Sequence, residues 1–370
     1  MPILRLYCGC AKSGCAKYER APILPSFGRG GITSILLHPF SSLKPRILMR
    51  RRQLGKPIVL GILTASGLIT LLLYSRLRAQ GPFGHETITF SQTLQIGGAQ
   101  IQVDFAEGKF DLPNSALLQW VDKAARAVTA YYGHFPVTRA RVLIVPTNGQ
   151  AIHGTTWGDI RGFAGFTRMR VGAHVSQSDL SDDWTMTHEL THMAFPSLPD
   201  DQHWMEEGLA TYVEPNARAQ IGDLTVRQVW EGVVDGIPKG EPQSGDQGLD
   251  RTHTWGRTYW GGALFCLVAD VNIRRQTGNR KGLQDALRAI VNAGGTIDHD
   301  WPLTRALGIG DRATGTTVLT DQYKKWGDAP VQVDLPALWK ELGITSGPNG
   351  VTFDNSAPQA SVRQAITSPK

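Results

Sequence analysis

The pentapeptide His188-Glu189-Leu190-Thr191-His192 restricts the fold and the chemistry of this chain more than any other segment. It lies in a stretch with helical periodicity, and positions i and i+4 of a helix share a face, so both imidazoles converge on one point with Glu189 beside them. Two nitrogen ligands at this separation suit a zinc ion, and the carboxylate can take a proton from a metal-bound water. The segment therefore predicts a zinc site with a general base.

A catalytic zinc needs a third protein ligand and one position left for water. The next predicted helix offers two candidates, Glu206 and Glu207, in the segment WMEEGLATYVE. The spacing alone does not choose between these two carboxylates.

The two motifs together, HELTH followed by WMEEGLATYVE, resemble the gluzincin metallopeptidases, notably the aminopeptidase N-like and glycyl aminopeptidase families with their W-x-x-E-G-x-A motif. The resemblance implies that Glu207 is the third zinc ligand and that Gly208 allows a close approach between helices. It also implies a compact peptidase-MA-like domain with a thermolysin-like core and one Zn²⁺ per chain. The resemblance covers about residues 162–288, a third of the chain.

A second segment, YWGGAL followed by LVADVNIRRQTG, is similar to the Y-x-K-G-A-L and LDxxIRxxTG segments of glycyl aminopeptidases. By this resemblance Tyr259 would stabilise the oxyanion of the tetrahedral intermediate, although Gly261 replaces the lysine of the family. Aminopeptidases also carry a G-x-M-E-N strand before the zinc helix, whose glutamate binds the free amine of the substrate. Residues 162–179 contain no glutamate, so the resemblance does not extend to exopeptidase activity.

Three further histidines are weaker candidates for lining the cleft: His174, His203 and His253. Histidines at such positions more often lie at the surface or bond to a neighbouring residue.

The order of sequence patterns predicts an α+β fold, with an N-terminal, mostly antiparallel sheet followed by a helical subdomain. Alternation around Gly97-Gly98 predicts two strands within 86–105, a helix follows at 115–132, and a buried strand at 141–145 is stopped by Pro146. A glycine-rich extended segment at 162–175 is expected at the sheet edge beside the site. Helical periodicity then predicts helices at 183–195, 204–220, 225–235, 255–277 and 281–293, with shorter ones to about Leu342.

The charge of the chain is unevenly distributed. Residues 1–79 contain 13 of the 38 Lys and Arg but one of the 32 acidic residues, so the remainder is mildly acidic. The basic balance therefore belongs to a leader, and nucleic acid is not expected as a partner. We divide the chain into a basic cytoplasmic leader (1–56), a membrane segment (57–78), a zinc metallopeptidase domain (79–344) and a flexible tail (345–370).

The membrane segment includes 18 consecutive uncharged residues at 58–75, which as a helix would span roughly 27 Å. Basic residues on its N-terminal side favour a cytoplasmic N-terminus and an extracytoplasmic catalytic domain. A cleaved signal peptide or an organellar transit peptide are the alternatives. Met49 precedes three arginines and is a natural initiator, in which case residues 1–48 are not translated.

The cysteines indicate no disulfide within the folded domain. Cys8, Cys10 and Cys15 lie in the leader, so Cys266 is the only thiol after it, in an apolar helical run. We expect Cys266 to be a small buried hydrophobic residue.

These patterns predict a membrane-anchored, extracytoplasmic zinc metallopeptidase that acts on a peptide or protein substrate. His188, His192 and Glu207 would bind zinc, Glu189 would act as the general base, and Tyr259 would support the oxyanion. Two alternatives remain: a non-catalytic, zinc-stabilised binding module, and a zinc hydrolase that acts on an amide outside peptides.

Overall fold

The first half of the fold is a five-stranded sheet, in the part of the chain that this computed structural model describes, residues 86–369. Gly97 and Gly98 both have positive φ and form a tight turn, so the first two strands pair antiparallel. The sheet order is β1-β2-β3-β5-β4, in which β2–β3 and β3–β5 are parallel and β5–β4 is antiparallel. The strands are β1 (Ile88–Ile96), β2 (Ala99–Ala106), β3 (Arg139–Thr147), β4 (Ile152–Ile160) and β5 (Phe163–Gly172).

The α+β prediction is confirmed, with the antiparallel arrangement present in two of the four strand pairs. The predicted edge segment, 162–175, was misplaced. It forms β5, which lies between β3 and β4, so the edge strand on this side of the sheet is β4. The sequence of β4, IHGTTWGDI, lacks the apolar alternation that marks most strands, so its pattern gave no strand signal.

We predicted from the sequence that this strand stops at Pro146, but β3 continues through Pro146 to Thr147. Its pairing with β2 ends at Ile144, so beyond that residue β3 has an unpaired edge, while pairing with β5 continues to Thr147. A proline without an N–H is tolerated where no ladder bond is needed from it.

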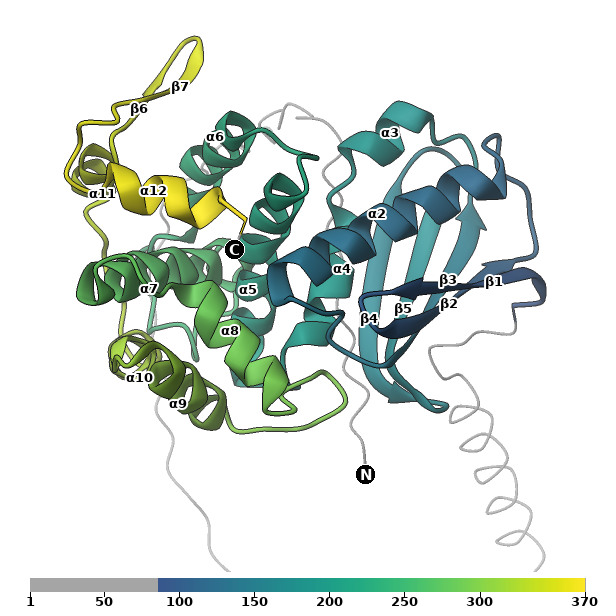
Figure 1. Cartoon of the computed structure of the whole chain (residues 1–370), viewed down its shortest axis with the longest axis horizontal. Helices are drawn as coiled ribbons and strands as arrows, with labels where there is room; N and C mark the ends of the chain where they lie inside the picture. The colour runs from purple at the N-terminus through teal and green to yellow at the C-terminus, as the bar shows by residue number, and fades with distance from the viewer. Residues whose placement is uncertain (1–85, 370) are drawn as a thin grey trace, which may run out of the picture. The chain divides into compact units, whose positions relative to one another are not determined.

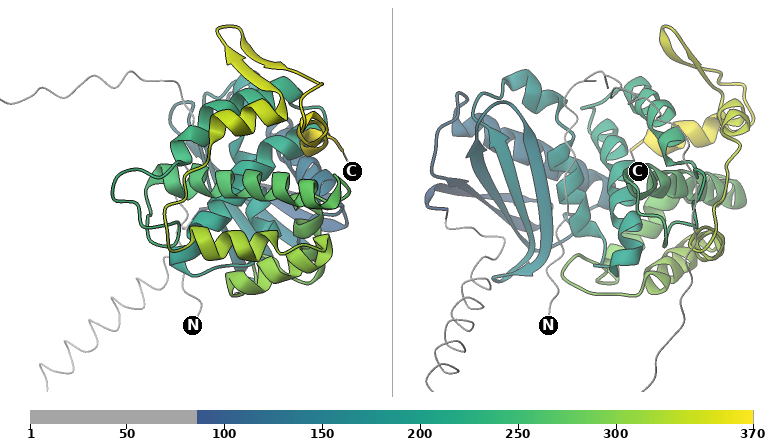
Figure 2. Two further views of the ribbon diagram at one scale, coloured as in Figure 1. Left: turned by 90° about the vertical axis from the view of Figure 1, so that its left-hand side faces the viewer. Right: turned by 180° about the vertical axis from the view of Figure 1, so that it is seen from behind.

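The helices form a second region beside the sheet. Figures 1 and 2 show α2 lying across one face of the sheet, whereas the opposite face carries no helix in the described part of the chain. Helices α4 and α5 lie between the sheet and the remaining helices (Figure 1). The helices up to the chain's last third are α2 (Asn114–Tyr132), α3 (Gln177–Asp182), α4 (Thr185–Thr191), α5 (His203–Gln220), α6 (Val226–Gly236) and α7 (Gly262–Thr277). They are followed by α8 (Leu283–Asn292), α9 (Leu303–Thr314), α10 (Val318–Trp326) and α11 (Leu335–Leu342).

Two predicted helices are interrupted at points that matter for the site. The helix expected at 183–195 is α4 followed by a 3₁₀ turn, η1 (His192–Ala194). The helix expected at 255–277 begins as a π-helix, η4 (Gly256–Gly261), and continues as α7. Short π-helical segments are rare and occur frequently at functional sites.

The segment 345–369, which we predicted to be a flexible tail, is folded. It contains the hairpin β6 (Ile344–Gly347) and β7 (Gly350–Phe353), followed by α12 (Ala360–Thr367). Val362, Arg363 and Ile366 of α12 are buried. The packing of α12 was missed because a composition rich in Pro, Ser and Asn hides the few apolar residues that dock.

No helix within residues 86–369 is long and apolar enough to cross a membrane. The leader at 1–56 and the predicted anchor or signal segment at 57–78 lie outside the described residues, so these predictions stay predictions. Cys266 is free and buried, as expected.

Candidate metal centre

The helix that carries the first motif is short and wholly buried. All seven residues of α4 are buried, including His188 and Glu189. The carboxylate of Asp183 precedes the helix, accepts the N–H of Met186 at 3.0 Å and accepts the indole N–H of Trp120 of α2 at 3.1 Å. The first turn of α4 is thereby tied to α2, so the two histidines are presented from a fixed element.

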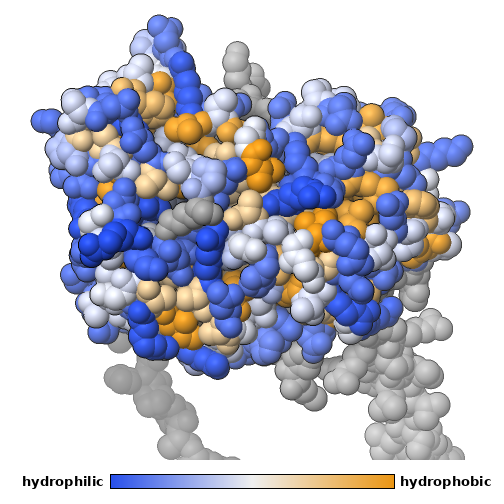
Figure 3. Space-filling model, viewed as in Figure 1, coloured by the Kyte–Doolittle hydropathy of each residue, from blue (hydrophilic) through white to orange (hydrophobic). Residues whose placement is uncertain are grey.

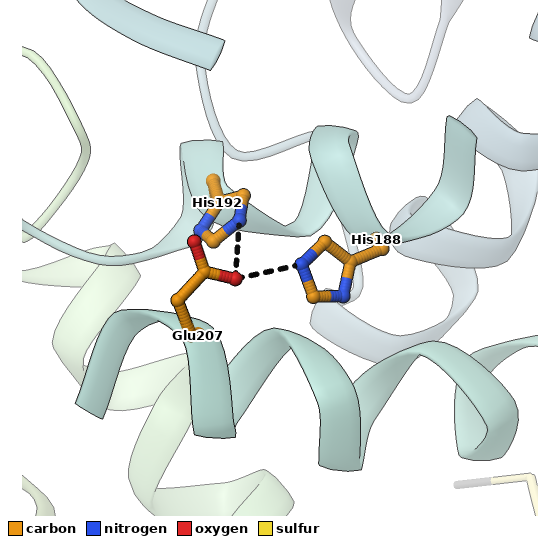
Figure 4. A group of neighbouring side chains, drawn as sticks. All are labelled: His188, His192 and Glu207. Atoms are coloured by element: carbon orange, nitrogen blue, oxygen red, sulfur yellow. Dashed lines mark hydrogen bonds and ion pairs between the residues drawn. The ribbon is translucent and has the colours of Figure 1, made fainter. Parts of the chain in front are cut away.

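Helix α5 brings Glu207 to both histidines (Figure 4). Oε2 of Glu207 lies 3.1 Å from Nε2 of His188 and 3.7 Å from Nε2 of His192. One ligand atom from each of the three side chains lies within 4.8 Å of the others, and all three residues are buried. The structure thus places together the three ligands that the resemblance implied.

The alternative third ligand, Glu206, is engaged elsewhere. Its Oε1 accepts the backbone N–H of Leu198 at 3.0 Å, and its Oε2 lies 3.1 Å from Nδ1 of His203. Adjacent helix residues point about 100° apart, so one of the two glutamates faces α4 while the other faces the loop before α5. Of the two carboxylates that the sequence left open, Glu207 is therefore the one that lies with the two histidines.

The donor set fits a zinc ion. Two imidazole nitrogens and one carboxylate oxygen form the ligand group of a catalytic rather than a structural site, because three protein ligands leave a fourth position open. Burial lowers the pKa of His192 to about 3, which keeps its imidazole neutral and able to bind a metal. Burial alone would raise the pKa of Glu207, but His192, His188 and His203 outweigh it and hold that pKa well below its usual range.

His203 belongs to the site, although the sequence offered it only as a weak candidate. Its Nε2 lies 3.3 Å from Oε1 of Glu207, whereas the other carboxylate oxygen, Oε2, is the one that faces His188 and His192. Burial lowers the pKa of His203, but the bonds to Glu206 and Glu207 raise it to about 9. A residue that bonds the outer oxygen of a ligand fixes the orientation of that ligand.

Glu189 is held by the edge strand rather than by its own helix. The hydroxyl of Thr156 in β4 donates to Oε2 of Glu189 at 2.7 Å and lies 2.9 Å from the hydroxyl of Thr167 in β5. Burial raises the pKa of Glu189 to about 7, against the lowering effects of His188 and Thr156. A carboxylate with a pKa near neutrality can both accept and return a proton at physiological pH.

The strand face that meets the metal helix is made of small residues. A Cβ added to Gly154 would lie 2.3 Å from Cγ of Glu189, and one added to Gly165 would lie 2.5 Å from Sδ of Met193. Gly154, Thr156 and Gly158 alternate along β4 and therefore share one face. This period-two pattern of small residues is the signal in the sequence for a close approach of another segment.

Gly208 lets α5 and the π-helix region meet at backbone contact, as the resemblance implied. A Cβ added to Gly208 would lie 2.2 Å from Cα of Gly262, and one added to Gly262 would lie 2.2 Å from the carbonyl oxygen of Trp204. The contact places η4 directly beside the residue that follows Glu207 in sequence.

Tyr259, in the middle of η4, reaches the metal ligands through its ring. Its ring stacks on the imidazole of His188 with centroids 6.2 Å apart and planes inclined by 23°. The indole of Trp184 meets the same imidazole edge-on at 5.1 Å. The structure therefore places the ring of Tyr259 beside His188.

The other two histidines do not join the site. His174 is exposed and lies 2.9 Å from the carboxylate of Asp111, which is also exposed. His253 is exposed before η4. The edge strand β4 contains no glutamate, so the position that an aminopeptidase would use to bind a substrate amine has no counterpart there either.

Comparison with known proteins agrees with this architecture. No protein-family model matches the chain, and no curated protein matches its sequence. An aminopeptidase N family protein from Idiomarina loihiensis has a TM-score of 0.51 at 14% identity, over 71% of this chain and 50% of that chain. An M1 zinc metallopeptidase from Deinococcus radiodurans has a TM-score of 0.44 at 16% identity, over 66% of this chain and 52% of that chain. The chain thus shares its fold with the first of these proteins, and it spans about half the length of both.

Proposed function

We propose that this chain is a zinc-dependent hydrolase that cleaves peptide bonds. The observation that carries the proposal is the convergence of ligand atoms of His188, His192 and Glu207 within 4.8 Å, with Glu189 next to His188 in α4. When bound, zinc supplies Lewis acidity towards a water molecule and a carbonyl oxygen. The rest of the chemistry belongs to residues of the chain.

Glu189 moves the protons. It accepts one from the attacking water and later delivers one to the leaving amine, which a carboxylate with a pKa of about 7 can do in both directions. Thr156 donates to Oε2 of Glu189, so we assign the proton exchange to Oε1. Removing water from this buried position strengthens every charge interaction within it.

Tyr259 supports the negative charge that develops on the carbonyl oxygen. Its ring is positioned by the stack on His188, and a phenol O–H so placed can donate a hydrogen bond to an oxyanion near the metal. Such preorganised donors typically contribute about 10²–10³-fold in rate.

The leading alternative, a zinc-stabilised binding module, accounts less well for the site. A structural zinc site usually closes its fourth position with a protein ligand, whereas the described residues supply three. Such a site also has no use for a buried carboxylate at Glu189, whose desolvation is costly.

We further propose that the catalytic domain is extracytoplasmic and attached to the membrane through residues 57–78. The support is the uncharged stretch at 58–75 and the excess of basic residues before it. Protease protection of the full chain in sealed vesicles tests the placement, with cleavage from the cytoplasmic side as the contrary result.

The function is tested by Glu189→Gln in the full chain, with exposed Glu107→Gln as the control. We expect Glu189→Gln to bind about one zinc per chain by elemental analysis and to lose cleavage of a mixed peptide library by about 10³-fold. His188→Ala should lose the zinc as well. Full cleavage by zinc-loaded Glu189→Gln would refute the mechanism, and zinc without cleavage in the unmodified chain would favour the binding module.

A further inference from the structure

Trp255 is the most exposed large hydrophobic side chain among the described residues, at 50%. On the face seen in Figure 3, hydrophilic residues predominate and hydrophobic residues form small patches among them. The other exposed large hydrophobic residues, such as Ile221 and Val226, are smaller and less exposed. An exposed indole of this size leaves a flat aromatic surface available for stacking with a ligand.

Trp255 is connected to the metal ligands by a continuous series of rings. It stacks on Tyr259, one turn later, with centroids 6.0 Å apart and planes inclined by 29°. Tyr259 in turn stacks on His188 at 6.2 Å. The indole thus lies two ring contacts from the zinc ligands, at the solvent end of this series.

The loop before Trp255 is anchored, so the indole is held in place before any substrate arrives. The carboxylate of Asp250 accepts the indole N–H of Trp204 and the hydroxyl of Tyr323, each at 2.7 Å. After Trp255, the buried guanidinium of Arg257 pairs with Asp246 at 2.8 Å. A rigid aromatic surface loses little conformational entropy on binding, which favours its use as a binding surface.

We propose that Trp255 forms one wall of a subsite that binds an aromatic side chain of the substrate residue next to the scissile bond. The inference rests on the proposed peptidase function. A planar apolar ring can stack on the exposed indole face while its backbone reaches the metal centre, since ring pairs interact favourably at centroid separations of 4.5–7 Å. A basic side chain could also lie over the indole, but it would approach the divalent ion, so the geometry favours the aromatic ring.

The test compares two otherwise identical peptides that carry phenylalanine or alanine at the varied position, using the full chain with zinc bound. We expect Trp255→Ala to lower the preference for phenylalanine, measured as the ratio of the two kcat/KM values, by about tenfold. Trp255→Phe should retain most of the preference because it keeps a ring. Val226→Ala, which removes an exposed apolar side chain from α6, is the matched control and should keep the ratio.

A purely structural role for Trp255 predicts a different result. If the indole only supports Tyr259, Trp255→Ala slows both peptides equally and leaves the ratio unchanged, which overturns the proposal. A third peptide carries lysine at the varied position. If Trp255→Ala lowers kcat/KM for the lysine peptide and not for the phenylalanine peptide, the proposal is also overturned.

A binding measurement separates this inference from the proposed function. The Glu189→Gln protein is titrated with the intact phenylalanine and alanine peptides, with and without Trp255→Ala. If the unmodified chain cleaves neither peptide, the proposed function fails, yet a Trp255-dependent preference in binding still supports the subsite. Equal affinities for both peptides, unchanged by Trp255→Ala, overturn the subsite alone.

Discussion

Substitution of Gly154 by alanine tests whether the edge strand positions the catalytic base. The new Cβ would lie 2.3 Å from Cγ and 2.7 Å from Cδ of Glu189, where ordinary contacts begin at 3.4 Å. The Glu189 side chain must therefore move by about 1 Å, away from its bond to Thr156. A misplacement of this size costs about 10²-fold in rate, and overpacking costs about 1–3 kcal/mol of stability. The three atoms nearest the added Cβ all belong to Glu189, so we expect zinc to remain bound.

The assay measures kcat on a peptide substrate, zinc content and Tm for the same preparation. Gly232→Ala is the control, because Gly232 lies in α6 with nothing within 4 Å of an added Cβ. This control should retain full activity and gain about 0.5–1 kcal/mol. If Gly154→Ala keeps more than half of the kcat and an unchanged Tm, the contact with Glu189 is soft and the role given to the edge strand is refuted.

Two further predictions concern residues that the sequence undervalued. His203→Ala should weaken zinc affinity by about 10–100-fold in a competition titration, because Glu207 loses the partner on its outer oxygen, whereas His174→Ala at the surface should not. Equal affinities would exclude this role for His203. Arg363→Ala should cost about 3 kcal/mol and lower Tm by several degrees, because the buried guanidinium bonds the carbonyls of Leu342 and Gly343. Exposed Arg312→Ala is its control, and an unchanged Tm would show that the C-terminal segment does not stabilise the domain.

The metal ligands could be found from the sequence because their geometry is local. His188 and His192 are one helical turn apart, and the helix alone brings them together. Glu207 required more, since nothing in its spacing distinguishes it from Glu206, and the resemblance decided between them. The structure gives the physical reason, which is that Glu206 is engaged by the N–H of Leu198.

The parts that the sequence did not reveal depend on contacts between distant segments. Thr156 lies 33 residues before Glu189, in a strand whose glycines and threonines carry no apolar signal. His203 is recognisable as a site residue only after α5 has been docked on α4. The π-helix η4 interrupts a pattern that continues unbroken in sequence, and directly after it Gly262 meets Gly208 of α5, a contact between segments that local propensity does not encode.

The hairpin that joins β4 to β5 sets the register of β4 and therefore the side chains that face Glu189. Its two connecting residues, Arg161 and Gly162, both have positive φ, which is the geometry of a type I′ turn. Side chains alternate along a strand, so a one-residue shift of this register would turn Thr155 and Trp157 towards Glu189 in place of Gly154 and Thr156. The length of this surface turn, nearly thirty residues from Glu189 in sequence, therefore determines which side chains of β4 face the proposed base. Insertions there should abolish catalysis while leaving the metal ligands intact.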